Sequence, residues 1–334
     1  MIREVSGREW DELLDVHGLT DAYLRRGYIS ASAMLDPGEA KLLILETRDG
    51  GVAFPLLVRP IPQEPNLNDA TSPYGYGGPI GFGAVPPWKA FHAAYERWCI
   101  ENRIITTFVR FHPLYGNQQE AASSMRVETL AGTVGWRIEA GRSLLGQLHK
   151  HHRRQVHRTT DFKVVQEEFA NEGVARFRDL YGATMRRVGA STFYHFPDAY
   201  WEALRVGLGR RLSLAEVVDG EGSVLAAALL LMTPPWLHYH LGASTEEGRR
   251  VGATVRLFLD VAQAAQEAGF RVFHLGGGLG GSADSLLRFK SRFDPEGALL
   301  EAAVGKQIHD MTEYRRLTGV VDTPGFFPRY REPR

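Results

Sequence analysis

The pattern of apolar and polar residues in the first part of the chain predicts a hairpin, a helix and a further strand. Residues 41–59 form two apolar runs, KLLILET and VAFPLLVR, joined by an Asp-Gly-Gly turn that favours a hairpin. Residues 61–87 are rich in proline and glycine and are predicted to be a loop. A proline pair then begins a helix with one apolar face, and residues 104–111 are the next strand.

The same order recurs in the second half. Residues 212–218 and 224–232 are predicted strands around an Asp-Gly-Glu-Gly turn, and residues 236–241 are a third. A loop over residues 242–252 leads into a helix that ends at Gly269, before another strand. The copies share a pattern without sequence identity, which indicates two similar α/β units side by side, with a cleft where ligands could bind. Helices are also predicted for residues 143–160, 174–188 and 197–208.

Composition narrows the class of protein. The 334 residues are 44% hydrophobic and 23% charged, which is typical of a globular chain. Lys and Arg (39) balance Asp and Glu (39), so a polyanion would have to bind a local patch. Cys99 is the only cysteine, which excludes an intrachain disulfide and a cysteine-built zinc site, and its place on an apolar helix face predicts a core residue.

The longest apolar run, residues 224–232, is shorter than the roughly 20 residues of a membrane-spanning helix. The first twelve residues carry acidic groups and have no apolar core, unlike a signal peptide. We therefore expect a cytoplasmic protein without an integral membrane segment. Work at the inner face of the membrane stays open.

One segment carries a strong charge bias. Residues 141–160 hold five Lys or Arg, four His and no acid, a composition that suits a phosphate backbone. The candidate contacts for tRNA or phosphate are Lys150, Arg153, Arg154 and Arg158. The histidines do not have the spacing of metal ligands, and no metal is expected. The alternative is a solvated cationic helix.

A second phosphate candidate precedes the helix of the second unit. Arg249-x-x-Gly252-x-Thr254 looks like the pyrophosphate loop of GNAT acetyltransferases, although Thr254 stands where Gly or Ala is usual. Backbone N–H groups at a helix N-terminus bind phosphate, and glycine allows close approach. The alternative is an ordinary strand-to-helix connection with solvated arginines.

Two glycine-rich segments are further candidates. A predicted strand runs into Gly276-Gly277-Gly278-Leu279-Gly280-Gly281 and then into a segment where Arg288, Lys290 and Arg292 alternate with Phe289 and Phe293. A lysine beside a cleft can stabilise an oxyanion. In the first half, Tyr74 and Tyr76 lie among glycines and could line a ligand site together with Arg110.

These segments resemble the Fem family of cell-wall peptidyltransferases. The resemblance is carried by Leu237 to Ser244, by the triple glycine with the Phe289-Lys290 element after it, and more loosely by Tyr74 to Pro79 and Phe111-His112-Pro113. It extends from about residue 40 to residue 316 and includes the basic helix. The Phe-Lys element is its most specific part.

The resemblance implies an α/β (α+β) fold of two tandem GNAT-like domains, each a mixed, mostly antiparallel sheet flanked by helices, with a cleft between them. We place the first domain at residues 1–140 and the second at residues 141–317, and expect the tail 318–334 to return to the first. No segment has the length or heptads of the coiled-coil arm found in longer Fem proteins, which indicates a short form.

The resemblance also implies a reaction. Fem proteins move an amino acid from aminoacyl-tRNA to an amine of a peptidoglycan precursor by aminolysis of an ester. By resemblance Lys290 stabilises the oxyanion and Phe289 lines the site. Arg187 (or its neighbour Arg186) and Tyr194 match the stretch that holds the diphosphate and sugar of the acceptor, and Tyr239 matches a substrate-site tyrosine at the end of a central strand. Aminoacyl-tRNA is then a co-substrate and no bound cofactor is needed. The nearest acids, Asp284 and Asp294, are not assigned as a base.

Three functions stay open at this point. The first is a tRNA-dependent aminoacyltransferase whose acceptor is a UDP-MurNAc-peptide, a lipid-linked precursor or a small amine. The second is an acyl-CoA N-acyltransferase that uses acetyl-CoA or another acyl-CoA at Arg249 to Thr254. The third is a binding protein that keeps the fold without the activity.

Overall fold

The computed structural model describes residues 1–319 and 325–332 and divides the chain into two units. Unit 1 comprises residues 1–130 and 301–334, and unit 2 comprises residues 131–300. The boundary lies ten residues before the one expected at residue 140, because the strand over residues 134–137 pairs within unit 2. Of the expected tail 318–334, residues 320–324 and 333–334 lie outside the described residues.

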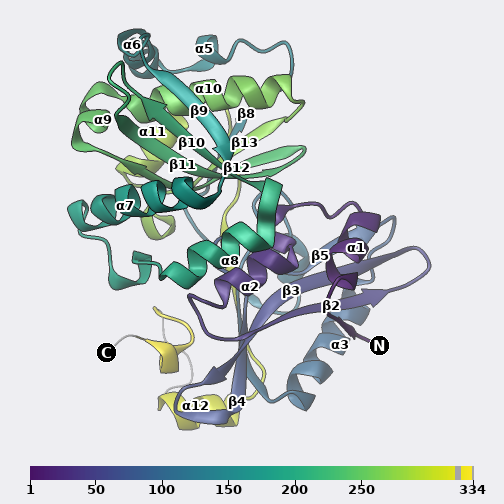
Figure 1. Cartoon of the computed structure of the whole chain (residues 1–334). Coiled ribbons are helices and arrows are strands. Elements are labelled where there is room, and N and C mark those ends of the chain that lie inside the picture. Colours follow the sequence, from purple (N-terminus) through teal and green to yellow (C-terminus); the bar gives the residue numbers. More distant parts are fainter. Residues whose placement is uncertain (320–324, 333–334) are drawn as a thin grey trace. The chain divides into compact units, whose positions relative to one another are not determined.

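Unit 1 is a mixed sheet with helices (Figure 1). Its strands are β1 (Arg3–Val5), β2 (Glu39–Glu46), β3 (Gly50–Ile61), β4 (Glu64–Thr71), β5 (Ile80–Gly83), β6 (Ile104–Arg110), β7 (Arg126–Thr129) and β14 (Ala303–Ile308). Its helices are α1 (Glu9–Val16), α2 (Arg26–Ser32), α3 (Trp88–Glu101), α4 (Gln118–Ala121) and α12 (Met311–Thr318). Short 3₁₀ turns cover Ala22–Leu24 and Arg329–Arg331.

The strand order of unit 1 is β1-β2-β3-β4-β6-β14-β7, with β5 paired to β3. All pairs are antiparallel except β4 with β6, which α3 connects as a crossover helix. The central strand β3 is buried at all but one position, as expected of a strand covered on both faces. The apolar face of α3 packs on it, and Cys99 is fully buried in this core.

Unit 2 has the strands β8 (Val134–Arg137), β9 (Lys163–Glu168), β10 (Leu212–Val218), β11 (Val224–Thr233), β12 (Trp236–Ser244) and β13 (Val272–Gly276). Its helices are α5 (Leu144–Gln147), α6 (Lys150–Arg158), α7 (Asn171–Arg187), α8 (Asp198–Leu208), α9 (Glu246–Val251), α10 (Ala253–Glu267) and α11 (Ser285–Ser291). Short 3₁₀ turns cover Thr192–Tyr194, Gly209–Arg211 and Leu279–Gly281.

The strand order of unit 2 is β8-β13-β12-β11-β10-β9, and the parallel pair is β12 with β13. Helix α10 is the crossover between these strands and lies on one face of the sheet, while α7 lies on the other (Figure 1). Strand β11 is therefore buried along nearly its whole length. The structure thus confirms the prediction of two α/β units, each a mixed, mostly antiparallel sheet flanked by helices.

Several predicted elements are corrected by the structure. The predicted loop over residues 61–87 contains β4 and β5, and the predicted loop over residues 242–252 contains the end of β12 and helix α9. The predicted helix over residues 143–160 is broken into α5 and α6, because the backbone N–H of His149 donates to the carbonyl of Arg292. Among the described residues, no helix is long and apolar enough to cross a membrane.

Candidate functional site

The parallel strands of unit 2 part from one another near their carboxyl ends. Their pairing ends at His238 opposite His274, although β12 runs on to Ser244. The register of β12 against β11 also shifts between Leu229 and Leu230, which leaves His240 as the extra residue of a bulge. After the last pair with β13, β12 thus stays paired with β11 on one side, apart from the bulged His240, and diverges from β13 on the other.

Lys290 lies at this divergence. Its Nζ donates a hydrogen bond of 2.8 Å to the carbonyl oxygen of Gly277, directly after β13, and lies 5.5 Å from the centre of the Tyr239 ring on β12. The residue is 6% exposed. Burial lowers the pKa of Lys290 to about 8, against a smaller opposing effect of the Asp284 carboxylate. The ammonium group is therefore charged at neutral pH and is held in a dry setting, where it interacts strongly with a developing negative charge.

The glycine loop and Asp284 hold the lysine's helix in place. The Asp284 carboxylate accepts the N–H groups of Leu287, at 2.9 Å, and of Leu279, at 3.0 Å, so it caps α11 and ties the loop to it. Gly276 has φ +76°, a conformation that favours glycine. A Cβ at Gly278 would overlap the carbonyl of Ser282. The glycines predicted as a ligand-approach segment thus also shape the loop that positions α11.

Phe289 and Tyr239 are the other predicted residues near Lys290. Phe289 is half-buried and packs edge to face on Phe293, with ring centres 5.6 Å apart. Tyr239 packs on Phe258 of α10, and its burial raises the pKa of its hydroxyl to about 12. The hydroxyl therefore stays protonated and can act only as a hydrogen-bonding group at neutral pH.

The cationic side chains of helix α6 differ in their exposure and in their hydrogen bonds. Lys150, Arg154 and Arg158 are exposed, whereas Arg153 turns back and donates to the carbonyls of Gly146 and Leu148. Arg153 therefore acts within the fold. The helix packs against α10. It contributes one buried histidine, His152, which the sequence analysis did not single out.

The predicted pyrophosphate loop is helical in the structure. Thr245 caps α9 by accepting the N–H of Gly248, and the N–H of Gly252 is bonded to the carbonyls of Gly248 and Arg249. Gly252 has φ +83° and ends the helix. A Cβ there would lie 2.9 Å from the side chain of Gln155 on α6. Arg249 is exposed, but it lies in a capped helix where the sequence predicted a loop.

Arg187 and Tyr194 lie apart from this group along the chain. Arg187 is the exposed last residue of α7, and Tyr194 is a half-buried residue of the following 3₁₀ turn, with its ring 5.4 Å from that of Phe193. The structure describes no contact between Arg187 or Tyr194 and the Lys290 element within residues 131–300.

In unit 1, Tyr76 lies in a buried polar and aromatic cluster. Its ring is 5.9 Å from His112, and burial raises the pKa of its hydroxyl to about 12, which Arg110 partly offsets. The carbonyl of Tyr74 accepts a hydrogen bond from the Tyr28 hydroxyl. Arg110 is exposed, with its guanidinium 5.0 Å from the Phe108 ring.

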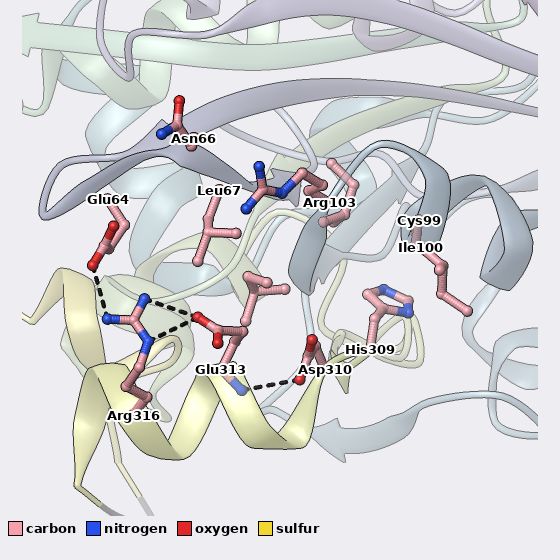
Figure 2. Close-up of a pocket in the computed structure, with 12 residues that line it drawn as sticks. Glu64, Asn66, Leu67, Cys99, Ile100, Arg103, His309, Asp310, Glu313 and Arg316 are labelled. Carbon is pink, nitrogen blue, oxygen red and sulfur yellow. Dashed lines mark hydrogen bonds and ion pairs between the residues drawn. The ribbon is translucent and has the colours of Figure 1, made fainter.

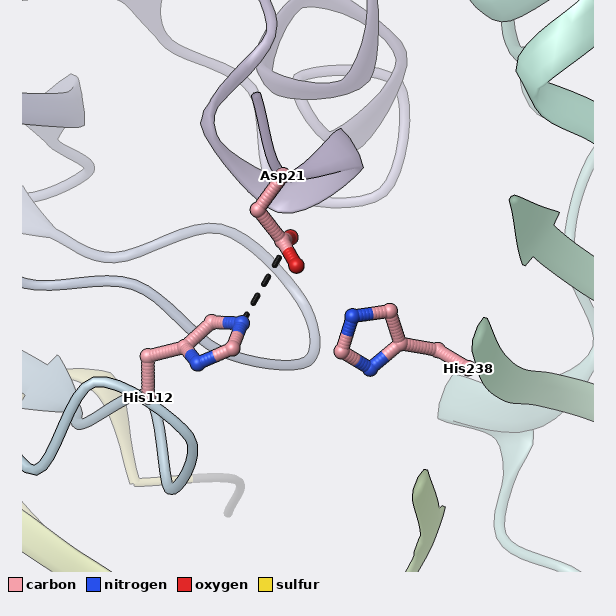
Figure 3. A group of neighbouring side chains, drawn as sticks. All are labelled: Asp21, His112 and His238. Atoms are coloured by element: carbon pink, nitrogen blue, oxygen red, sulfur yellow. Dashed lines mark ion pairs between the residues drawn. The ribbon is translucent and has the colours of Figure 1, made fainter. Parts of the chain in front are cut away.

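The same cluster holds a buried acid that the sequence analysis missed. The Nε2 atom of His112 lies 3.5 Å from a carboxylate oxygen of Asp21 (Figure 3). Asp21 also accepts the N–H of Tyr23 at 2.9 Å. Its signal in the sequence is an Asp before a short turn, which is too common to single out.

Unit 1 also has a polar cavity of about 450 Å³ between β4, the end of α3 and the start of α12 (Figure 2). Arg316 pairs there with Glu64 and Glu313, both at 2.8 Å, and Asp310 caps α12. The Arg316 guanidinium is therefore held in the cavity wall by two carboxylates.

Comparisons with known proteins agree with this geometry. Residues 131–291 match the family described as acetyltransferase (GNAT) domain. Among solved structures, FemX matches with a TM-score of 0.70 at 14% identity, over 95% of this chain and 99% of that one. No curated protein matches the sequence.

Two further structures share the fold. One is L-PGS from Bacillus licheniformis, with a TM-score of 0.57 at 11% identity over 90% of this chain and 91% of that one. Another is a tandem GNAT protein from the clavulanic acid biosynthesis pathway, with a TM-score of 0.53 at 12% identity over 93% and 99%.

The resemblance to the Fem family is thus confirmed at the level of the fold. The matched domain covers all the strands of unit 2 and reaches through Lys290 to the end of α11. The chain is an acyltransferase with a GNAT domain at residues 131–291, built in the tandem GNAT fold that it shares with FemX.

Proposed function

We propose that the protein transfers an amino acid from aminoacyl-tRNA to an amine and forms an amide bond. The observation that carries the proposal is the buried ammonium group of Lys290 at the point where β12 and β13 part. An ester needs no further activation for attack by an amine, so the enzyme must bring the two together and stabilise the oxyanion.

In this reaction the amine nitrogen attacks the ester carbonyl and gives a tetrahedral oxyanion. Lys290 donates to that oxyanion in place of the Gly277 carbonyl to which it is now bonded. The bond between carbon and the tRNA ribose oxygen then breaks as the amide forms. The proton lost by the amine passes to the ribose oxygen, directly or through water, and atoms balance without a cofactor.

Aminoacyl-tRNA is proposed as the donor because helix α6 carries a cluster of positive charges. Its exposed cations, Lys150, Arg154 and Arg158, stand in a stretch of residues 141–160 without an acid. Such a surface suits a phosphate backbone and carries a strong salt dependence. As acceptor we propose an amine of a UDP-MurNAc-peptide, of a lipid-linked precursor or of a small molecule, with Arg187 and Tyr194 as contacts.

An acyl-CoA donor is the second candidate, favoured by the match to an acetyltransferase domain. Its pyrophosphate would need open N–H groups around Gly252. The N–H of Gly252 is bonded within α9, and Gln155 stands against the glycine. Both observations count against phosphate binding at Gly252 itself.

The test offers radiolabelled aminoacyl-tRNAs, and separately acetyl-CoA, with amine acceptors that include UDP-MurNAc-pentapeptide. We expect label to move from tRNA. Arg154→Glu with Arg158→Glu should raise KM for tRNA about tenfold or more, because lost phosphate contacts weaken binding. Lys89→Glu with Arg97→Glu, an exposed cationic pair on α3 of unit 1, is the matched control. Label moving from acetyl-CoA alone would contradict the proposal.

A further inference from the structure

Two hydrogen bonds join the N-terminal end of α6 to the C-terminal end of α11. The backbone N–H of His149 donates to the carbonyl of Arg292 at 2.8 Å, and Nε2 of His152 lies 3.0 Å from the carbonyl oxygen of Phe289. That second carbonyl belongs to the residue directly before Lys290. Within α11 it accepts only a longer bond, 3.3 Å, from the N–H of Arg292. The histidine is therefore a main partner of a carbonyl at the frayed end of the lysine's helix.

The protonation of His152 follows from its surroundings. The residue is fully buried, and burial lowers its pKa to about 4, with smaller opposing effects of its own hydrogen bonds. The neutral ring has one N–H, and a carbonyl can only accept, so Nε2 carries the hydrogen. The Gln155 atom that lies 3.2 Å from Nδ1 is Oε1. Exchanging the amide oxygen and nitrogen, which have nearly the same shape, makes the NH₂ group of Gln155 the donor to Nδ1 and leaves Nε2–H for the carbonyl of Phe289.

Packing restricts this histidine further. Its ring centre is 5.0 Å from that of Phe289 and 4.6 Å from that of Phe293. The side chain of Gln155 is itself held against Gly252 at the start of α10. Helix α11 is thus fixed from one side by Asp284 at its beginning and from the other by His152 at its end.

We propose that His152 is a positioning residue for Lys290: its Nε2–H fixes the backbone at Phe289 and thereby the place of the lysine ammonium. The proposal rests on the proposed function in that Lys290 is taken as the group that stabilises the oxyanion. It also gives α6 two roles, since the outward face of the same helix carries the cations proposed to bind the tRNA.

Two variants separate the hydrogen bond from the packing. His152→Phe keeps an aromatic ring against Phe289 and Phe293 but removes the donor, whereas His152→Gln places an N–H near the position of Nε2. We expect His152→Phe to lower kcat about tenfold or more with KM for aminoacyl-tRNA unchanged within about twofold, as for a misplaced catalytic group. His152→Gln should recover most of the rate. His157→Phe, on the exposed face of α6, is the control.

A second readout does not depend on transfer activity. Labelling of Lys290 by acetic anhydride, followed by peptide mass spectrometry across pH, reports the fraction of free amine. The wild type should titrate near pH 8, with Asp284 and Tyr239 as its neighbours. In His152→Phe the midpoint should move upward, because a loosened helix exposes the ammonium to water. Thermal unfolding checks that each variant is folded.

The outcomes distinguish the two proposals. A normal kcat and an unmoved Lys290 titration in folded His152→Phe would overturn the positioning role while leaving the proposed function intact. An upward shift of that titration in a protein that transfers nothing from aminoacyl-tRNA would support the positioning role and defeat the proposed function. A loss of kcat that His152→Gln does not relieve, with Lys290 titrating as in the wild type, would also count against the positioning role.

Discussion

The two units arrange their strands around the same kind of parallel pair, but the pair stays closed in unit 1 and opens in unit 2. In unit 1, β4 and β6 pair up to Thr71 and Phe108, and two backbone bonds beyond them, Ser72 to Phe108 and Gly77 to Arg110, continue the contact. In unit 2 the pairing ends at His238 and His274, and Lys290 lies beside the gap. The two units thus share a strand arrangement but differ at the carboxyl ends of their parallel strands. A few backbone hydrogen bonds hold these ends together in unit 1 and are missing from the described pairing in unit 2.

The comparison teaches where function enters a repeated fold. Each sheet is completed beside its parallel pair by a strand from elsewhere in the chain, β14 beside β6 and β8 beside β13. These strands stabilise both units alike. The differences lie at the carboxyl ends of the parallel strands, where ligands bind in open α/β sheets. We therefore propose that the chemistry takes place in unit 2.

The largest expected effect comes from removing the charge at the open end. Lys290→Met keeps the length of the side chain but cannot stabilise an oxyanion, and kcat should fall about 10²–10³-fold. Lys163→Met, at an exposed position of β9, should leave the rate unchanged. The measurement is the steady-state transfer rate of each of the two variants. Equal rates would remove Lys290 from the mechanism.

The rate should also fall at high pH. Burial lowers the pKa of Lys290 to about 8, and the ammonium form is the active one, so kcat should drop about tenfold per pH unit above that value.

The free energy of unfolding should change with pH in the opposite sense to the rate. Between pH 8 and the unfolded pKa near 10.5 the unfolded chain binds more protons, so the free energy of unfolding rises with pH. Urea unfolding at pH 8 and pH 10 measures this, and in Lys290→Met both effects should disappear.

A methyl group added at a tightly packed glycine should affect the two units differently. A Cβ at Gly242 would overlap the Tyr239 hydroxyl, so Gly242→Ala should displace the ring beneath Lys290 and lower kcat about tenfold. The matched change in unit 1 is Gly77→Ala. A Cβ atom added there would lie 3.1 Å from its nearest neighbour, the Cβ of Ser72. It should cost stability and leave kcat unchanged. Equal losses of rate in both variants would argue against a site confined to unit 2.

The smallest effect on rate is expected from the tail of unit 1. Arg331 pairs with Asp69, a fully buried carboxylate that also binds Arg59. Arg331→Ala removes one of the two cations and should lower the free energy of unfolding by about 1–3 kcal/mol. The kcat of the folded enzyme should not change. Denaturant unfolding with a parallel activity assay checks both statements.

The regular parts of the fold could be predicted from the sequence because their signals are local. The hairpins have strong turns, and α3 and α10 have clear apolar faces between recognisable ends. Strand β4, EPNLNDAT, was missed because its polar sequence gives no strand pattern. Helix α9 was interpreted as a loop although Thr245 caps it and Gly252 ends it.

The site could be predicted only in part. Lys290 stood out through its resemblance to a family element, but its contacts depend on the fold. Its bond to Gly277 spans 13 positions, and the bond from His152 to Phe289 spans 137. A single sequence carries no signal for such pairs. The loop predicted over residues 242–252 was wrong for a related reason, since local glycine and arginine spacing fits a capped helix equally well, while phosphate binding at Arg249 and Gly252 stays a prediction.

The most direct test asks which unit holds the acyl group. A tRNA charged with benzoylphenylalanine would be bound to the wild-type protein and irradiated, and the crosslinked peptides identified by mass spectrometry. The account predicts crosslinks in residues 239–244 and 276–290, at the open end of the unit 2 sheet. Crosslinks confined to residues 68–78 and 104–112, at the closed pair of unit 1, would contradict it.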